Sequence, residues 1–251
     1  MSDRIAQRDG TRKRLKKARR KQLLIRLGTA VGVVALLIAL ALIFQVRTIH
    51  ITGNSFLTKE EILQYIEKQG GADNSLILLA RTKFGSFPVP DTAESIQFTM
   101  KNPWTIQVKV TEKTPIGYVE SDGKYVYFDE EGYVLGILEE LREDVTKIEG
   151  LDVKKASKGK KLSVKDDAVF GYLVQVIDLL ERKELASDRI LCDGENITLY
   201  FGEICVELGS GNPEEKIAQL PTILPMLEGQ KGTLHLEHFG DSTDTISFEK
   251  K

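Results

Sequence analysis

Apolar residues follow three patterns along this chain, and each pattern is typical of a different structure. The first is a run of twenty uncharged residues, 27–46, bounded by Arg26 and Arg47. A helix of this length rises about 30 Å, which is the thickness of the hydrocarbon core of a bilayer. Because a helix also satisfies its own backbone hydrogen bonds in lipid, the run predicts a transmembrane helix rather than a buried helix of a soluble protein.

A cleaved signal peptide is the alternative interpretation of this run. Residues 39–41, Ala-Leu-Ala, have the small-x-small form that a signal peptidase requires. The apolar run nevertheless continues through residues 42–44, where a polar cleavage region would begin. We therefore interpret the run as an uncleaved anchor.

The second pattern, over residues 46–112, consists of short apolar segments that switch between strand and helix periodicity. Thr58 and Glu61 have the spacing of a capping box. Ile106, Val108 and Val110 alternate with polar residues, as on a strand with one buried face. The predicted order is a strand over 46–52, a helix over 58–70, a shorter helix over 75–80, and strands over 95–100 and 105–111. Such a β-α-α-β-β unit is small but large enough to fold.

The third pattern, over residues 113–251, predicts a mixed, mostly antiparallel sheet with flanking helices, so the fold class is α+β. Asp122-Gly123 is a strong hairpin signal. Strands are predicted over 116–120, 124–128, 133–138, 189–192, 197–201, 204–208, 233–236 and 245–248, and helices over 165–185 and 212–227. Pro221 and Pro225 should kink or shorten the last helix. The segment 139–165 is charged, with five lysines within residues 154–161. It is expected to be a solvated loop, with contact to an anionic wall polymer or to lipid headgroups as the alternative.

Charge is distributed asymmetrically, although 35 Lys+Arg against 37 Asp+Glu give a net charge of only −2. Residues 1–26 contain eleven basic and two acidic residues, and Arg19, Arg20, Lys21 and Arg26 lie nearest the apolar run. The positive-inside rule therefore predicts a cytoplasmic N-terminus and an extracytoplasmic C-terminus. Such a basic segment could also bind nucleic acid, but topology and anionic lipid headgroups explain it more simply, so we expect no nucleic-acid partner.

Two segments resemble a known protein family. The residues VRTIHITGNSFLTKEEI (46–62) look like the opening of a POTRA domain. Together with PWTIQVKVTEKTPIGYVESDGKYVYFDEEGYVL (103–135), they resemble the FtsQ/DivIB family of bacterial cell-division proteins. The resemblance extends over residues 12–250 and is strongest over 46–135. It implies a basic cytoplasmic tail (1–26), a transmembrane helix (27–46), a POTRA domain (47–112) and a β-domain (113–251) with allowance for flexible last residues.

The resemblance also implies a function. Members of this family are non-enzymatic scaffolds at the division septum that recruit FtsB/DivIC and FtsL proteins, and septal wall-synthesis proteins are further candidate partners. The late strands of the β-domain would bind the partner by strand addition. This assigns a partner-binding site to the following residues: Leu234, Leu236, Glu237, His238 and Phe239. In this hypothesis Phe239 is an apolar anchor and Glu237 a charge partner.

A second set of residues follows from the position of the first predicted strand beside the membrane. We expect the segment from Val46 to Ser55, next to the membrane, to matter for the placement of the POTRA unit. The candidate residues of this membrane-proximal strand and of the turn after it are Val46, Ile49, Ile51, Gly53 and Asn54.

The sequence contains no P-loop, dinucleotide fingerprint or nucleophile elbow, so we predict neither catalysis nor a cofactor. His235 and His238 are three residues apart on a predicted strand and should face opposite sides, so they cannot easily share one ion and we expect no metal site. For Cys192 and Cys205, on neighbouring predicted strands, we favour two free thiols over a disulfide.

Two other functions remain open from the sequence. The POTRA-like unit would also fit a factor for envelope assembly or transport. An extracytoplasmic β-domain with a lysine-rich loop would also fit a protein that binds the cell wall.

Overall fold

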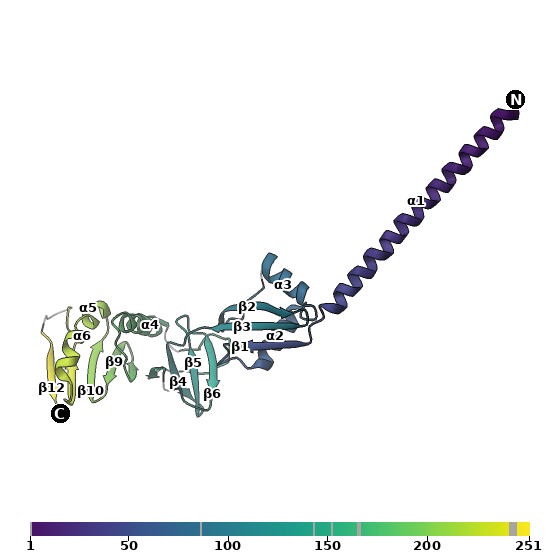
Figure 1. Cartoon of the computed structure of the whole chain (residues 1–251). Helices are drawn as coiled ribbons and strands as arrows, with labels where there is room; N and C mark the ends of the chain where they lie inside the picture. Colours follow the sequence, from purple (N-terminus) through teal and green to yellow (C-terminus); the bar gives the residue numbers. More distant parts are fainter. Residues whose placement is uncertain (1, 86, 143, 152, 165–166, 241–244) are drawn as a thin grey trace. The chain divides into compact units, whose positions relative to one another are not determined.

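A computed structural model describes residues 2–85, 87–142, 144–151, 153–164, 167–240 and 245–251, with side chains described for Gln22 and from Leu24 onward (Figure 1). It divides into two compact units. The first comprises residues up to Thr52, Leu63–Pro88 and Gln97–Lys109, and the second comprises Gly53–Ile62, Val89–Ile96 and Val110–Lys251. Because parts of the predicted 47–112 domain belong to the second unit, the predicted division at residue 112 stays a prediction.

The first unit begins with a long helix, α1 (Ser2–Ile43), which Figure 1 shows as uninterrupted. Its residues Leu24–Ile43 are exposed and are apolar enough over a sufficient length to cross a membrane. The helix ends three residues before the end of the predicted span. Ser75 holds the end of this helix: the Phe44 carbonyl accepts the Ser75 N–H at 2.9 Å, and the Ser75 hydroxyl donates to the Pro103 carbonyl at 2.6 Å.

The predicted order β-α-α-β-β is confirmed. The elements are β1 (Thr48–Thr52), α2 (Lys59–Gln69), α3 (Ser75–Phe84), β2 (Ala93–Asn102) and β3 (Thr105–Glu112). The strands form a sheet in the order β1-β3-β2, with β1 parallel to β3. Apolar side chains from each kind of element are buried in the first unit: Ile51, Ile66, Leu78, Ile106 and Val108.

Local capping residues explain where these helices begin. The predicted capping box is present at the start of α2, where Thr58 N–H donates to the Glu61 carboxylate at 2.7 Å and Glu61 N–H donates to the Thr58 hydroxyl at 3.2 Å. At α3 the Asn74 side chain accepts the N–H groups of Leu76 and Ile77. These side chains satisfy backbone donors that a helix cannot satisfy itself.

Within the described residues, the second unit contains a nine-stranded sheet in the order β12-β11-β10-β9-β8-β7-β4-β5-β6. Its strands are β4 (Gly117–Ser121), β5 (Lys124–Phe128), β6 (Val134–Leu138), β7 (Lys147–Glu149), β8 (Arg189–Asp193), β9 (Asn196–Phe201), β10 (Ile204–Gly209), β11 (Gly232–His235) and β12 (Ser247–Lys250). Most neighbouring pairs are antiparallel, but β4/β7, β7/β8 and β10/β11 are parallel. The α+β class and the mixed sheet are therefore confirmed.

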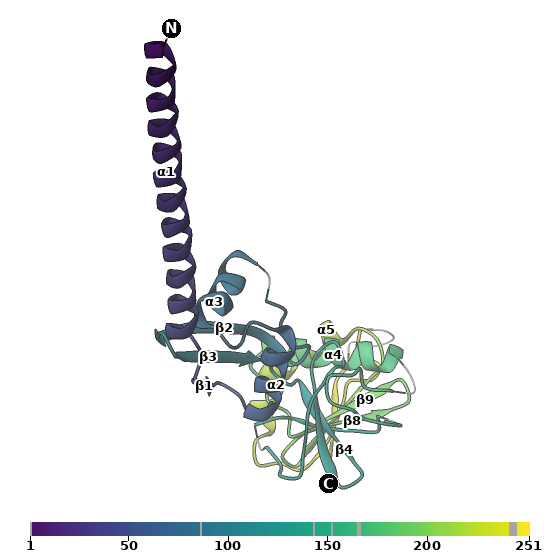
Figure 2. The ribbon, with the colours of Figure 1, turned by 90° about the vertical axis from the view of Figure 1, so that its right-hand side faces the viewer.

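One face of this sheet is apolar and covered by helices (Figure 2). The helices are α4 (Asp167–Arg182), α5 (Pro213–Ile217), α6 (Leu220–Ile223) and the 3-10 turn η1 (Leu224–Leu227). They pack on a row of cross-strand neighbours from β7 to β11: Ile148, Ile190, Leu199, Val206 and Leu234. Side chains alternate along a strand, so the residues between these lie on the opposite face. That face is polar around Glu207 and His235, but over β4–β6 it buries a second cluster of Phe56, Tyr118, Tyr127 and Leu135.

Two parts of this fold differ from the predicted elements. Strand β7 lies in the segment predicted as a loop, because its three residues give too short a pattern to recognise. The predicted helix 212–227 is divided into α5, α6 and η1, whose breaks fall beside Pro221 and Pro225. Proline lacks the N–H that would continue the helical hydrogen bonds, so the predicted shortening is confirmed.

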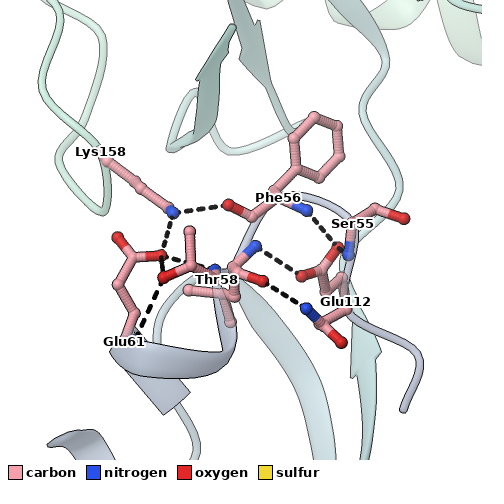
Figure 3. A network of polar contacts seen from close by, with 8 residues as sticks. Ser55, Phe56, Thr58, Glu61, Glu112 and Lys158 are labelled. Atoms are coloured by element: carbon pink, nitrogen blue, oxygen red, sulfur yellow. Dashed lines mark hydrogen bonds and ion pairs between the residues drawn. The ribbon is translucent and has the colours of Figure 1, made fainter. Parts of the chain in front are cut away.

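A carboxylate and a lysine organise residues 55–61 of the second unit (Figure 3). The Glu112 carboxylate accepts the backbone N–H groups of residues 55, 56 and 57, each at 2.8 Å. The Lys158 ammonium donates to the Phe56 carbonyl at 2.6 Å and to the Glu61 carboxylate at 2.7 Å. Partial burial tends to raise the pKa of Glu61, but the hydrogen bonds from Lys158 and Thr58 outweigh it and lower the pKa.

We predict that replacing Glu112 with Gln releases the backbone of residues 55–57. The amide has nearly the same size, but one accepting oxygen becomes a donor nitrogen that cannot accept these N–H groups. Loss of charge-assisted hydrogen bonds should speed hydrogen exchange at these three amides by roughly 10- to 100-fold. The measurement is hydrogen exchange on the full chain in detergent micelles.

Glu131→Gln is the matched control, because that carboxylate is exposed and bonds Lys113 instead of backbone. Exchange at residues 55–57 should stay at the wild-type rate in the control. If Glu112→Gln also left these rates unchanged, the carboxylate would not be what holds this segment.

Candidate partner-binding site

Among the residues that the structure describes, the sheet of the second unit ends at β12, which pairs with β11 on one side. In this antiparallel pair Lys251 N–H donates to the Lys231 carbonyl at 2.9 Å. Alternate residues of an antiparallel strand direct their backbone groups to opposite sides. The N–H and C=O groups of Phe248 and Lys250 therefore point away from β11, toward the open edge of the sheet. This edge is the feature that strand addition requires.

Two of the predicted partner-binding residues have buried side chains. Leu234 lies in the middle of β11, opposite Phe248, and is 1% exposed. Leu236 follows the strand and is fully buried in the same core. These side chains hold the last strands on the helices, so they contribute to any binding surface only by shaping the backbone.

The other three predicted residues follow β11 and differ in environment. Glu237 is partly buried, and its carboxylate lies 3.3 Å from the Nδ1 atom of His235. His238 is exposed. Phe239 is half-buried and packs against the core, so part of its ring remains available as the predicted apolar anchor. Their roles in partner binding stay predictions.

On the face of the sheet opposite the helices, a polar cluster contains a residue that the sequence analysis did not identify. Glu207 on β10 pairs in register with His235 on β11, and its carboxylate lies 3.0 Å from the Nδ1 atom of His235. Partial burial tends to lower the pKa of His235, but the charges of Glu237 and Glu207 outweigh it and raise the pKa. Only the strand register, which no sequence spacing reveals, brings Glu207 to this position.

The membrane-proximal residues that were predicted to position the POTRA unit are distributed over both units. In the first unit, Val46 donates its N–H to the Asp73 carbonyl at 2.9 Å, and Ile49 and Ile51 pair in register with β3. In the second unit, Gly53 has a φ of +82°, and a Cβ there would collide with the Val110 carbonyl. The Asn54 side chain donates to the Leu57 carbonyl at 2.8 Å. All five thus contribute to local backbone structure. Their role in positioning the POTRA unit beside the membrane stays a prediction.

The predicted topology residues are described only in part. The side chains of Arg19, Arg20 and Lys21 lie outside the described residues, whereas Arg26 is exposed on α1. The predicted orientation across the membrane therefore stays a prediction.

Cys192 and Cys205 are free thiols, as expected. They lie on β8 and β10, and β9 separates these strands. Cys192 is buried in the core, and this burial raises the pKa of its thiol to about 11.

Comparison with known proteins gives distant but extended similarity. No protein-family model matches the chain. It is 24% identical over 179 residues to the "Cell division protein DivIB" of Clostridium botulinum, and the aligned region covers 69% of each chain. It is 22% identical over 192 residues to the protein of the same name from Clostridium acetobutylicum, which covers 75% of each chain.

We predict that Gly232→Ala loosens β12. A Cβ at Gly232 would lie 2.7 Å from the ring of Phe248 and would collide with the Glu249 carbonyl. The strand should therefore separate from β11, and hydrogen exchange of the amides that face β11, those of Glu249 and Lys251, should become at least roughly tenfold faster. Gly171→Ala on α4 is the control, because a Cβ there meets no atom within 4 Å. Equal exchange in both variants would contradict the tight packing of β12 on Gly232.

Proposed function

Since these two relatives support membership of the FtsQ/DivIB family, we propose that this chain is a membrane-anchored scaffold of the bacterial division machinery. Similarity to proteins named for cell division supports a role in that process. In this proposal the protein recruits and stabilises FtsB/DivIC-type and FtsL-type division proteins at the septum, and septal wall-synthesis proteins are further partners. Its contribution is binding rather than catalysis.

Anchoring in the membrane explains how weak contacts with other division proteins can be sufficient for recruitment. An exposed apolar helix over Leu24–Ile43 confines the following units to the membrane surface. Other membrane-anchored division proteins are confined to the same surface, so their effective concentration near this chain is high. The basic segment before the helix places the N-terminus in the cytoplasm and both units outside in this proposal.

The open edge of β12 is the observation that supports partner recruitment. An extended segment of the partner would pair with the outward N–H and C=O groups of Phe248 and Lys250. The pairing would extend the sheet by one strand and would leave the helix-covered core unchanged. The exposed part of Phe239 would add an apolar contact beyond the strand.

Cellular localisation tests the division role. We predict that the full chain, labelled with a fluorescent protein at its N-terminus, gathers at midcell in dividing cells. An even outline of every cell, with normal protein level and length, would contradict a place in the division machinery.

Substitution of Lys250 tests the edge itself. Lys250→Pro removes one outward N–H, but a proline is tolerated on an edge strand where its nitrogen faces solvent. We predict that capture of a co-expressed DivIC-type protein by the full chain weakens about tenfold, as expected for one lost hydrogen bond near 1.4 kcal/mol.

Lys250→Ala is the matched control, because it removes the same side chain and keeps the N–H. It should bind like the wild type. Equal binding by the Pro and Ala variants, with β12 folded in both, would mean that the partner does not bind at the open edge of β12. Midcell localisation would then still stand, so the two tests separate the division role from the binding mode.

A further inference from the structure

Three potential metal ligands meet on the polar face of the last strands. The Nδ1 atom of His235 lies 3.0 Å from a Glu207 oxygen and 3.3 Å from a Glu237 oxygen. One ligand atom from each residue lies within 4.8 Å of the other two. The strand register makes Glu207 and His235 direct neighbours, and the turn that follows β11 brings the Glu237 carboxylate to the same histidine.

A glycine allows the third ligand to approach. The register of β10 shifts between Glu207 and Gly209, where Gly209 has a φ of +68°. A Cβ at Gly209 would lie 2.9 Å from the Cβ of Glu237. The absence of that atom lets the segment after β11 lie directly against β10, with Glu237 turned toward Glu207 and His235.

The charges of this cluster are unbalanced. A third carboxylate, that of Glu249 on β12, lies 3.7 Å from the Nε2 atom of His235. Even a protonated His235 would leave two net negative charges among these four side chains. The Lys216 ammonium donates to the Glu237 backbone carbonyl at 3.1 Å.

One carboxylate oxygen has no donor in the structure. The Oε2 atom of Glu237 is buried, and no hydrogen-bond partner reaches it within the described residues. Burial of part of a carboxylate without a donor costs free energy, and a nearby cation lowers that cost. The other oxygen of the same carboxylate, Oε1, is the one that faces the Nδ1 atom of His235, so a cation bound there would offset the excess negative charge of the cluster.

From this geometry we propose that Glu207, His235 and Glu237 bind a divalent transition-metal ion of the zinc type. One imidazole nitrogen and two carboxylate oxygens, with water in the fourth position, form an ordinary tetrahedral zinc site. Ligand atoms on such an ion are about 3.4 Å apart, close to the two shortest separations in this cluster. The imidazole favours zinc over magnesium or calcium, which prefer oxygen ligands alone.

The sequence led us to expect no metal site, because the pair of potential ligands that it offered was His235 and His238. In the structure, His238 is exposed beyond the end of β11 and is not among the three residues that cluster here. The ligands that join His235 come instead from β10 and from the second residue after His235. On binding, the metal would take the place of any proton on Nδ1, and that proton would pass to solvent.

Zinc titration of the full chain tests this site. The protein is purified in micelles without a histidine tag and stripped with a chelator, and zinc binding is measured by calorimetry. We expect one zinc ion per chain. His235→Asn and Glu237→Gln should each weaken binding at least tenfold. Magnesium and calcium should not compete at equal concentration.

His238→Asn is the matched control, because it removes an exposed neighbouring imidazole and keeps the proposed ligands. It should bind zinc within about twofold of the wild type. The proposal is overturned if the wild type binds no zinc at micromolar concentration. It is also overturned if His238→Asn weakens binding as much as His235→Asn, or if folded His235→Asn and Glu237→Gln bind like the wild type.

Discussion

An open β-sheet cannot complete its own backbone hydrogen bonds at its last strand, and this constraint organises the second unit. Its nine strands share one apolar face under α4, α5 and α6, so the core is closed by helices rather than by a barrel. The edge at β12 therefore remains. That strand has only four residues and carries Glu249 and Lys250, features by which natural proteins limit uncontrolled pairing at an edge. An edge that is short and charged, yet still presents backbone groups, suits a partner that supplies a specific strand.

The first unit faces a different constraint, because a membrane helix must continue into a folded unit without unsatisfied backbone groups. The end of α1 is held by Ser75, whose N–H and hydroxyl join Phe44 and the loop at Pro103. In the second unit the corresponding work is done by Glu112, whose carboxylate satisfies three consecutive N–H groups. In both places one side chain forms hydrogen bonds with backbone groups of a turn, where no helix or strand supplies partners for those groups.

Local signals in the sequence predicted most elements of this fold. The apolar run, the capping box at Thr58 and the alternation over Ile106–Val110 are all visible within a few residues, and the structure contains each of them. Contacts between distant residues were not predictable in this way. Lys158 lies almost a hundred residues from Glu61 in the sequence. The contact between them forms only because the loop that carries Lys158 folds back onto residues 55–61. For the same reason the sequence indicated Glu237 and His238 near the late strand but gave no sign of Glu207.

The zinc-type cluster and the open edge involve the same strands, and this connects them physically. Glu207 lies on β10, His235 on β11 and Glu249 on β12, so an ion bound here would link β10 to β11 and reduce the repulsion that Glu249 meets. A ligand that binds only the folded arrangement stabilises it by mass action. Bound metal would thus favour the ordered pairing of β11 with β12. Because the side chains of the cluster project from the sheet face while the outward N–H groups lie in the sheet plane, metal and partner strand would not compete for the same atoms.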